Sequence, residues 1–134
     1  MAVALKEANT EEFKEYARQV VKNAQHLAGW LTERGYTVCT GGTDSHLILW
    51  DTRPQDLTGS KVEYVLEQAA VSVNKNSVPG DKSALSPGGI RVGTPAMTSR
   101  GMVEADFEKV RRRARARARV CGCDKEGGGS VDKN

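Results

Sequence analysis

A long helical repeat of apolar residues near the start of the chain constrains its fold most strongly. Apolar residues recur there at steps of three and four: Phe13, Ala17, Val20, Val21, Ala24, Leu27, Ala28 and Leu31. This spacing predicts one amphipathic helix that ends near residue 34, with Asn9 and Glu12 as its capping pair and Gly35 as its left-handed stop. The apolar face of such a helix packs against a second layer of structure, which the rest of the chain must supply.

Two short apolar segments follow this helix. Residues 36–40 and His46–Asp51 are typical of strands, and the glycine-rich turn at residues 41–44 favours an antiparallel pair. The second segment is almost continuously apolar, which predicts burial on both faces. We interpret His46 and Asp51 as strand-end residues rather than catalysts, because the sequence places no nucleophile or carboxylate beside the histidine.

The next part of the chain indicates a second helix and a third strand. Ser60 and Glu63 have the spacing of a capping box, which predicts that a helix begins there. A strand through residues 71–73 follows and brings Asn74 and Asn76 to its end. Because side chains alternate along a strand, the two asparagines are expected on one face of the sheet.

The whole order of elements describes an α/β domain of the α+β type, with a small mixed or antiparallel sheet covered by helices. Residues 77–89 are rich in Pro, Gly and Ser and should form an irregular loop of the kind that carries binding groups. We place the domain at residues 1–122, with its sheet and helices over residues 36–110 and a basic terminal helix over residues 103–122. The glycine-rich residues 123–134 have the composition of a flexible tail.

Composition excludes several classes of protein. The chain is 38% hydrophobic and 28% charged, as is ordinary for a soluble domain, and no apolar run approaches the roughly 20 residues that span a bilayer. No membrane partner is therefore expected. Cys39, Cys121 and Cys123 lack the spacing of a disulfide framework, so we expect a reducing compartment. Cys121-Gly-Cys123 could be a metal or redox pair, but no second pair or histidine cluster accompanies it, and we expect no bound metal.

The net charge of +3 comes from one segment. Six arginines lie within Arg111–Arg119, so the rest of the chain sums to about −3. Such a run can bind phosphate backbones, but no aromatic residue is interleaved with it to stack on bases. Nucleic acid is therefore an unlikely partner, and a binding module that uses this run remains the alternative function.

Arg91 offers the clearest binding chemistry in the chain. It lies between Ile90 and Val92 in a glycine-flanked apolar segment, and strand alternation points its side chain away from theirs. The planar fork of a guanidinium suits a carboxylate or a phosphate held by two parallel hydrogen bonds. That anion could belong to an internal salt bridge or to a ligand, and the residues alone leave both open.

The segment around Arg91 ends a longer pattern, NKNSVPGDKSALSPGGIRVGTPAMTSRG, at residues 74–101. It is preceded by EFKEYARQVVKNAQHLAGWLTERGY and by GGTDSHLILWD. From about Met1 to about Val110, these blocks closely resemble the C-terminal small domain of serine hydroxymethyltransferase, the pyridoxal-phosphate enzyme that moves a one-carbon unit between serine and tetrahydrofolate. The resemblance implies the C-terminal domain of the aspartate-aminotransferase-like fold, known as fold type I.

The resemblance also implies roles for five residues. Arg91 matches the arginine that binds the carboxylate of serine or glycine, and Asn76 matches the asparagine that contacts the pterin of the folate. Ser83, Ala84 and Leu85 match a folate-contacting segment. No residue of this chain is expected to be catalytic or to bind pyridoxal 5'-phosphate, because the family's threonine-rich segment with its Schiff-base lysine has no counterpart here.

The parent protein implied by the resemblance converts serine and tetrahydrofolate reversibly to glycine and 5,10-methylenetetrahydrofolate. It would use pyridoxal phosphate, act as a homodimer or homotetramer, and be cytoplasmic, with a mitochondrial location as the alternative. This chain would be a fragment without the large cofactor-binding domain, inactive alone. A fragment of another fold type I enzyme, such as an aminotransferase, would share the arginine but lack the Asn76 loop. After Val110 the arginine run departs from the family pattern, through a divergent end or a reading-frame error.

Overall fold

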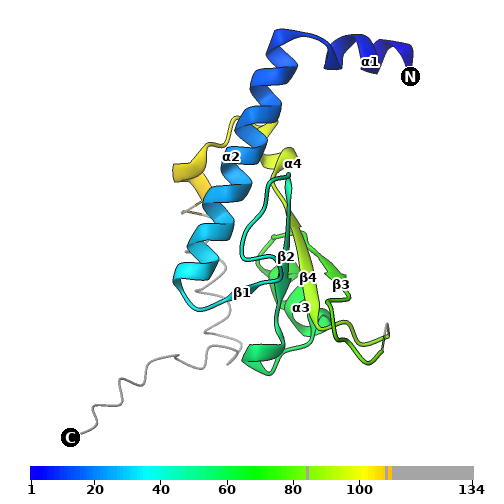
Figure 1. Ribbon diagram of the computed structural model, residues 1–134, viewed down its shortest axis with the longest axis vertical. Helices are drawn as coiled ribbons and strands as arrows, with labels where there is room; N and C mark the ends of the chain where they lie inside the picture. Colours follow the sequence, from blue (N-terminus) through cyan, green and yellow to red (C-terminus); the bar gives the residue numbers. More distant parts are fainter. Residues whose placement is uncertain (84, 108, 110–134) are drawn as a thin grey trace, which may run out of the picture.

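The computed structural model describes residues 1–83, 85–107 and 109, and it shows one sheet packed against helices (Figure 1). The elements in chain order are α1 (Ala2–Ala8), α2 (Glu11–Glu33), β1 (Thr37–Val38), β2 (Leu47–Asp51), the 3₁₀ turn η1 (Arg53–Gln55), α3 (Gly59–Gln68), β3 (Asn74–Asn76), β4 (Gly89–Gly93) and α4 (Pro95–Thr98). This order confirms the predicted small α/β domain.

The sheet has four strands in the order β1-β2-β4-β3, and every neighbouring pair is antiparallel. Of the mixed and antiparallel sheets that the sequence leaves open, the structure has the antiparallel one. The strand register places Arg91 of β4 between Leu49 of β2 and Asn74 of β3. Two residues earlier, Gly89 lies between Asp51 and Asn76. Arg91 is therefore on an inner strand, flanked on both sides.

One face of the sheet forms the core. Ile48 and Ile90 are both 0% exposed there, and Ala28 and Leu31 of α2 pack with Ile48 in one apolar cluster. The helix α3 covers the same face, since its Glu63 pairs with Lys75, the register partner of Ile90. The two helices that pack most on the sheet, α2 and α3, therefore leave the opposite face, which carries Arg91, uncovered in the described part of the chain.

The helix starts differ from the sequence predictions. Thr10, not Asn9, is the N-cap of α2, and its hydroxyl oxygen accepts the Phe13 N–H at 3.3 Å. Thr58, not Ser60, caps α3 in the same way. A cap residue needs an extended backbone that turns into the helix, and the two threonines have it, with φ and ψ of −80° and 157° in α2 and −92° and 150° in α3.

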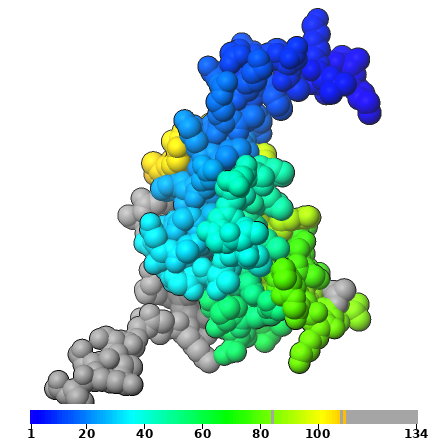
Figure 2. All heavy atoms as spheres, in the orientation of Figure 1, coloured from blue at the N-terminus to red at the C-terminus, as the bar shows by residue number. Residues whose placement is uncertain are grey.

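Asn9 instead ends a helix that the sequence does not indicate. The helix α1 turns away from the start of α2 and extends from the body of the molecule (Figures 1 and 2). None of its residues is buried, and Val3 and Leu5 are 71% and 66% exposed. Within the described residues, α1 thus adds nothing to the core.

The strands are shorter than predicted. Residues 36–40 yield only the two residues of β1, and the strand expected through residues 71–73 forms only at Asn74–Asn76. The prediction that β2 is buried on both faces is wrong, because Leu47 and Leu49 are only half-buried on the face without helices. The apolar residues of β2 therefore occupy both faces of the sheet, but only one of these faces is fully buried.

Gly35 has the expected left-handed backbone, with φ of +78°. Of the helix predicted over residues 103–122, the structure describes 103–107 and 109, of which 104–107 and 109 are helical; the remainder and the tail at residues 123–134 lie outside the described residues. In the part of the chain that is described, no helix is long and apolar enough to cross a membrane, and no cluster of His, Cys, Asp or Glu could hold a metal ion.

Candidate functional site

Arg91 lies exposed on the face of the sheet that has no helix over it. Among the described residues, no acidic side chain forms an ion pair with its guanidinium. The internal salt bridge, one of the two roles left open by the sequence, therefore has no partner in this part of the chain. The half-buried Leu49 and the exposed Asn74 flank the arginine in the neighbouring strands.

Asn76 shares this face with Arg91. The register sets Asn76 opposite Gly89, and Gly89 and Arg91 are two residues apart on one strand, so all three side-chain positions face the same way. Residues in this diagonal relation typically lie about 7–8 Å apart. The Asn76 Nδ2 donates to the Ser77 carbonyl oxygen at 2.7 Å, so the amide is bonded to the first residue of the loop that follows β3. The predicted shared face of the two asparagines is confirmed.

The segment 77–88 forms the irregular loop that its composition predicts. Ser83 is exposed and Leu85 is 93% exposed, and the Ser83 Oγ accepts the Leu85 N–H at 3.2 Å. Ala84 lies outside the described residues. Two of the three residues matched to the folate-contacting segment thus lie together at the tip of this loop.

The base of the loop folds over the sheet on the same face as Arg91. Val78 is only 3% exposed, and a Cβ built on Gly89 would collide with the Val78 Cγ1. Because Gly89 faces the same side as Arg91, Val78 must lie on that side as well. Asn76, the loop and Arg91 therefore border one surface.

An ionic cluster that the sequence does not indicate lies at the base of the loop. The Arg53 guanidinium binds the Asp51 carboxylate at 2.7 to 3.2 Å and donates to Asp81 at 3.2 Å. Arg53 lowers the pKa of the Asp51 carboxyl below its ordinary value. The backbone N–H groups of Gly88 and Val78 lower the pKa of Asp81. We name Arg53, Asp51 and Asp81 the loop clamp.

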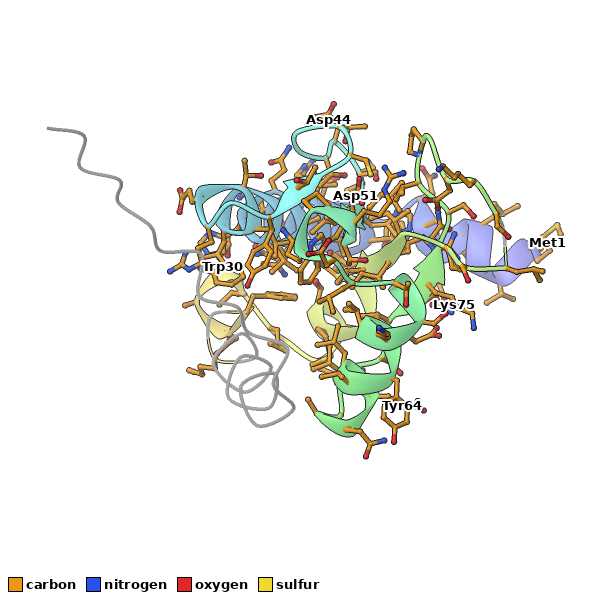
Figure 3. All side chains as sticks on the ribbon, turned by 90° about the horizontal axis from the view of Figure 1, so that it is seen from below. Met1, Trp30, Asp44, Asp51, Tyr64 and Lys75 are labelled. Carbon is orange, nitrogen blue, oxygen red and sulfur yellow. The ribbon has the colours of Figure 1, made fainter. Side chains whose placement is uncertain are left out.

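The prediction that Asp51 ends a strand is correct, and Figure 3 shows it among the packed side chains. The pairing of Arg53 with Asp81 is not readable from spacing, because these two residues are 28 positions apart. The Pro79-Gly80-Asp81 sequence does signal a turn in which an aspartate accepts local backbone N–H groups. That signal predicts the hydrogen bonds of Asp81 to the loop backbone, but not its ion pair with Arg53.

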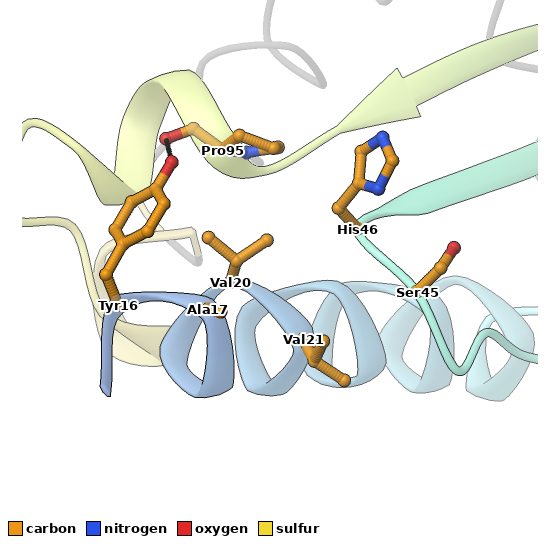
Figure 4. A pocket seen from close by; sticks show the side chains of 7 residues that line it. All are labelled: Tyr16, Ala17, Val20, Val21, Ser45, His46 and Pro95. Carbon is orange, nitrogen blue, oxygen red and sulfur yellow. Dashed lines mark hydrogen bonds between the residues drawn. The ribbon is translucent and has the colours of Figure 1, made fainter. Parts of the chain in front are cut away.

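A shallow hollow of about 360 Å³ lies elsewhere, where α2 meets the ends of β2 and β4 (Figure 4). Its lining is mostly apolar: Tyr16, Ala17, Val20, Val21, Ser45, His46 and Pro95. The Tyr16 hydroxyl donates to the Pro95 carbonyl oxygen at 3.2 Å. His46 is exposed at the rim and lies one residue before β2, which begins at Leu47 and not at His46 as predicted. The hollow holds no convergent set of charged groups, so it does not compete with the Arg91 face as a binding site.

The described residues do not by themselves fit pyridoxal phosphate. A Schiff-base lysine is typically activated by removal from water, but every lysine in the described ranges is exposed. Three of them form ion pairs, including Lys75 with Glu63 at 3.7 Å. That this chain contributes substrate contacts rather than a cofactor site stays a prediction.

Comparison with known proteins identifies the family. The family model described as serine hydroxymethyltransferase matches residues 1–113. The cytosolic serine hydroxymethyltransferase of Neurospora crassa is 60% identical to this chain over 110 residues, and serine hydroxymethyltransferase 4 of Arabidopsis thaliana is 56% identical over 110 residues. Each match covers 82% of this chain and 23% of the relative, so the chain spans about a quarter of the length of these curated relatives. These matches exclude the alternative that the chain is a fragment of an aminotransferase. The chain belongs to the serine hydroxymethyltransferase family.

Proposed function

We propose that this chain forms the part of a serine hydroxymethyltransferase that holds the substrate carboxylate and the folate. The whole enzyme would convert serine and tetrahydrofolate reversibly to glycine and 5,10-methylenetetrahydrofolate. The observation that carries the proposal is the exposed Arg91, which has no acidic partner among the described residues and lies on the same face as Asn76.

Arg91 would bind the carboxylate of serine or glycine. A guanidinium can donate two parallel N–H groups to the two carboxylate oxygens, which fixes both the position and the plane of the amino acid. Since β4 is an inner strand with partners on both sides, the backbone that carries Arg91 is held rigidly. Rigid orientation of the substrate is a large part of what such an enzyme must provide.

Asn76 and the loop tip would bind the folate. An amide side chain offers both donors and an acceptor, which suits a pterin ring that carries both kinds of group. Ser83 would add a hydroxyl, and Ala84 and Leu85 would add apolar contact. The 93% exposure of Leu85 supports this role, because a leucine so exposed is available to cover the flat face of a ligand.

The remaining features of the enzyme would come from residues outside this chain. We propose that the domain corresponds to the C-terminal small domain of fold type I, that the pyridoxal phosphate site is built by other parts of the protein, and that this chain alone is inactive. We propose further that the whole protein is a homodimer or homotetramer. Relatives are named as cytosolic and as mitochondrial enzymes, and we propose a cytoplasmic location for this one.

A chimera tests the proposal. The 110-residue segment matched to the cytosolic relative of Neurospora crassa would be replaced by its counterpart from this chain. We expect an active enzyme, and we expect Arg91→Gln to raise the KM for serine by about 100-fold, because a carboxylate loses two charged hydrogen bonds. Arg100→Gln is the matched control, since Arg100 is an exposed arginine that bonds only to its own turn among the described residues. An inactive chimera, or equal effects of the two variants, would contradict the proposal.

A further inference from the structure

The carboxylate of Asp81 closes the loop at residues 77–88. Its Oδ2 accepts the N–H of Val78 and the N–H of Gly88, each at 2.9 Å. These two residues stand near opposite ends of the loop. One side chain therefore joins the two ends, in the way that aspartate in a turn replaces a backbone acceptor.

Arg53 fixes the closed loop to the sheet. Its guanidinium bonds to both oxygens of Asp51, to Asp81 Oδ1 and, at 2.9 Å, to the Pro79 carbonyl oxygen. Asp51 is the last residue of β2 and the register partner of Gly89. The side chains of Asp51 and Asp81 are only 11% and 8% exposed, whereas that of Arg53 is 39% exposed, so the carboxylates are shielded from water and the guanidinium is partly solvated.

Backbone contacts tighten the same junction. The Thr52 N–H donates to the Gly88 carbonyl oxygen at 2.9 Å, and the Thr52 hydroxyl lies at the same distance from that oxygen. A Cβ on Gly88 would lie 2.6 Å from Asp81 Oδ1 and 2.7 Å from Arg53 Cγ. The glycine backbone thus packs directly on the clamp, and a larger residue would displace it.

The tip of the loop contrasts with its base. Ser83 and Leu85 are exposed, and the hydrogen bond between them lies within the tip. The base is fixed next to Asn76 and Arg91 by the clamp, whereas the tip presents its side chains to solvent. A loop held this way pays less ordering entropy when a ligand binds than a loop that closes only on binding.

We propose that Arg53 and Asp81 are positioning residues for the folate: they hold the loop at residues 77–88 in its binding geometry without touching the ligand. This inference rests on the proposed function of the loop. It assigns to the clamp a role in affinity for folate that is separate from the affinity for serine, because Arg91 is anchored by its own strand and not by the clamp.

The test uses the active chimera. Asp81→Asn removes the charge that Arg53 binds and replaces one acceptor with a donor, at nearly unchanged size. We expect the KM for tetrahydrofolate to rise by about tenfold, with kcat and the KM for serine within about twofold. Arg53→Lys keeps the charge but loses the two-pronged fork, and its KM for tetrahydrofolate should lie between those of the parent and Arg53→Gln. Lys82→Ala, an exposed neighbour of Asp81, is the control and should change neither KM.

Asn76→Ala separates the two levels of the proposal. If Asn76→Ala raises the KM for tetrahydrofolate and Asp81→Asn does not, the folate site stands and the clamp inference is overturned. If Asn76→Ala also has no effect, the proposed folate site itself fails. If Asp81→Asn raises both KM values equally and lowers the melting temperature of the chimera, the clamp only stabilises the fold, and the positioning role is refuted.

Discussion

Truncation of Ile90 would test the packing beneath the site. Ile90 precedes Arg91 in β4, lies between Trp50 and Lys75 in the neighbouring strands, and is 0% exposed. Ile90→Ala removes three buried carbon groups, worth about 0.8 kcal/mol each, or about 2.4 kcal/mol in lost transfer free energy. The cavity left behind adds to this, so we expect the free energy of unfolding to fall by about 3 kcal/mol.

The assay is urea unfolding of the 134-residue chain, followed by circular dichroism. Ile90→Val should cost only about 1 kcal/mol, because most of the side chain remains. Leu85→Ala is the matched control: it removes similar carbon groups from a residue that is 93% exposed, and it should change the free energy by less than about 0.5 kcal/mol.

The reasoning would be refuted if Ile90→Ala cost less than about 1 kcal/mol, or if Leu85→Ala cost as much as Ile90→Ala. Either result would mean that burial in this sheet does not follow the observed exposures. Absence of a cooperative unfolding transition in the parent chain would contradict the premise that α2, α3 and the sheet form a core of their own.

Four further predictions concern caps, pH, tight backbone contacts and the basic run. Thr10→Ala should lower the stability of the chain by about 1 kcal/mol in the same urea assay, since the Phe13 N–H loses its acceptor. The folded state lowers the pKa of the Asp51 and Asp81 carboxyls, so their contribution to stability should be complete above about pH 5 and be lost as the pH falls through about 4 and below. In a series of urea unfolding curves at different pH, a chain with asparagine at both positions should lose less stability over that range. Gly89→Ala should destabilise the chain by about 1–3 kcal/mol, because the new Cβ would lie 2.7 Å from the Trp50 carbonyl oxygen; an unchanged urea midpoint would contradict this. Replacing the six arginines of Arg111–Arg119 with alanine in the 134-residue chain should leave its affinity for single-stranded RNA unchanged. If the parent chain binds this RNA with a log–log salt slope near −4 and the replacement abolishes the binding, the alternative function is favoured.

Local rules predicted α2, α3 and the shared face of Asn74 and Asn76, but not α1, the strand bounds or the helix starts. The step of three and four in α2 and the alternation in β3 depend on a few neighbouring residues, and both were correct. Asn9 and Thr10 are both good caps by chemistry. The choice between them depends on where α1 ends, and the exposed α1 carries no periodic apolar signal strong enough to place that end.

Long-range contacts account for the other differences. Nothing near Arg53 in the sequence shows that it meets Asp81, because the fold alone brings η1 beside the loop. Glu63 was assigned to a capping box, yet its carboxylate accepts the Lys75 N–H at 3.0 Å and so satisfies a donor of the edge strand β3. A carboxylate three residues after a serine can serve either purpose, and only the position of β3 decides between them.

The proposed binding of a carboxylate by Arg91 depends on what covers the open face of the sheet. An exposed ion pair in water is worth about 0–1 kcal/mol, which is far too little to hold an amino acid. The same pair strengthens severalfold when its surroundings lose water. Leu47 and Leu49 are half-buried on this face, and Leu49 directly flanks Arg91. An arginine beside apolar residues on an uncovered face of a sheet has the features of one wall of a binding site. The strength of its ion pair with a carboxylate depends on the part of the protein that covers this face and excludes water.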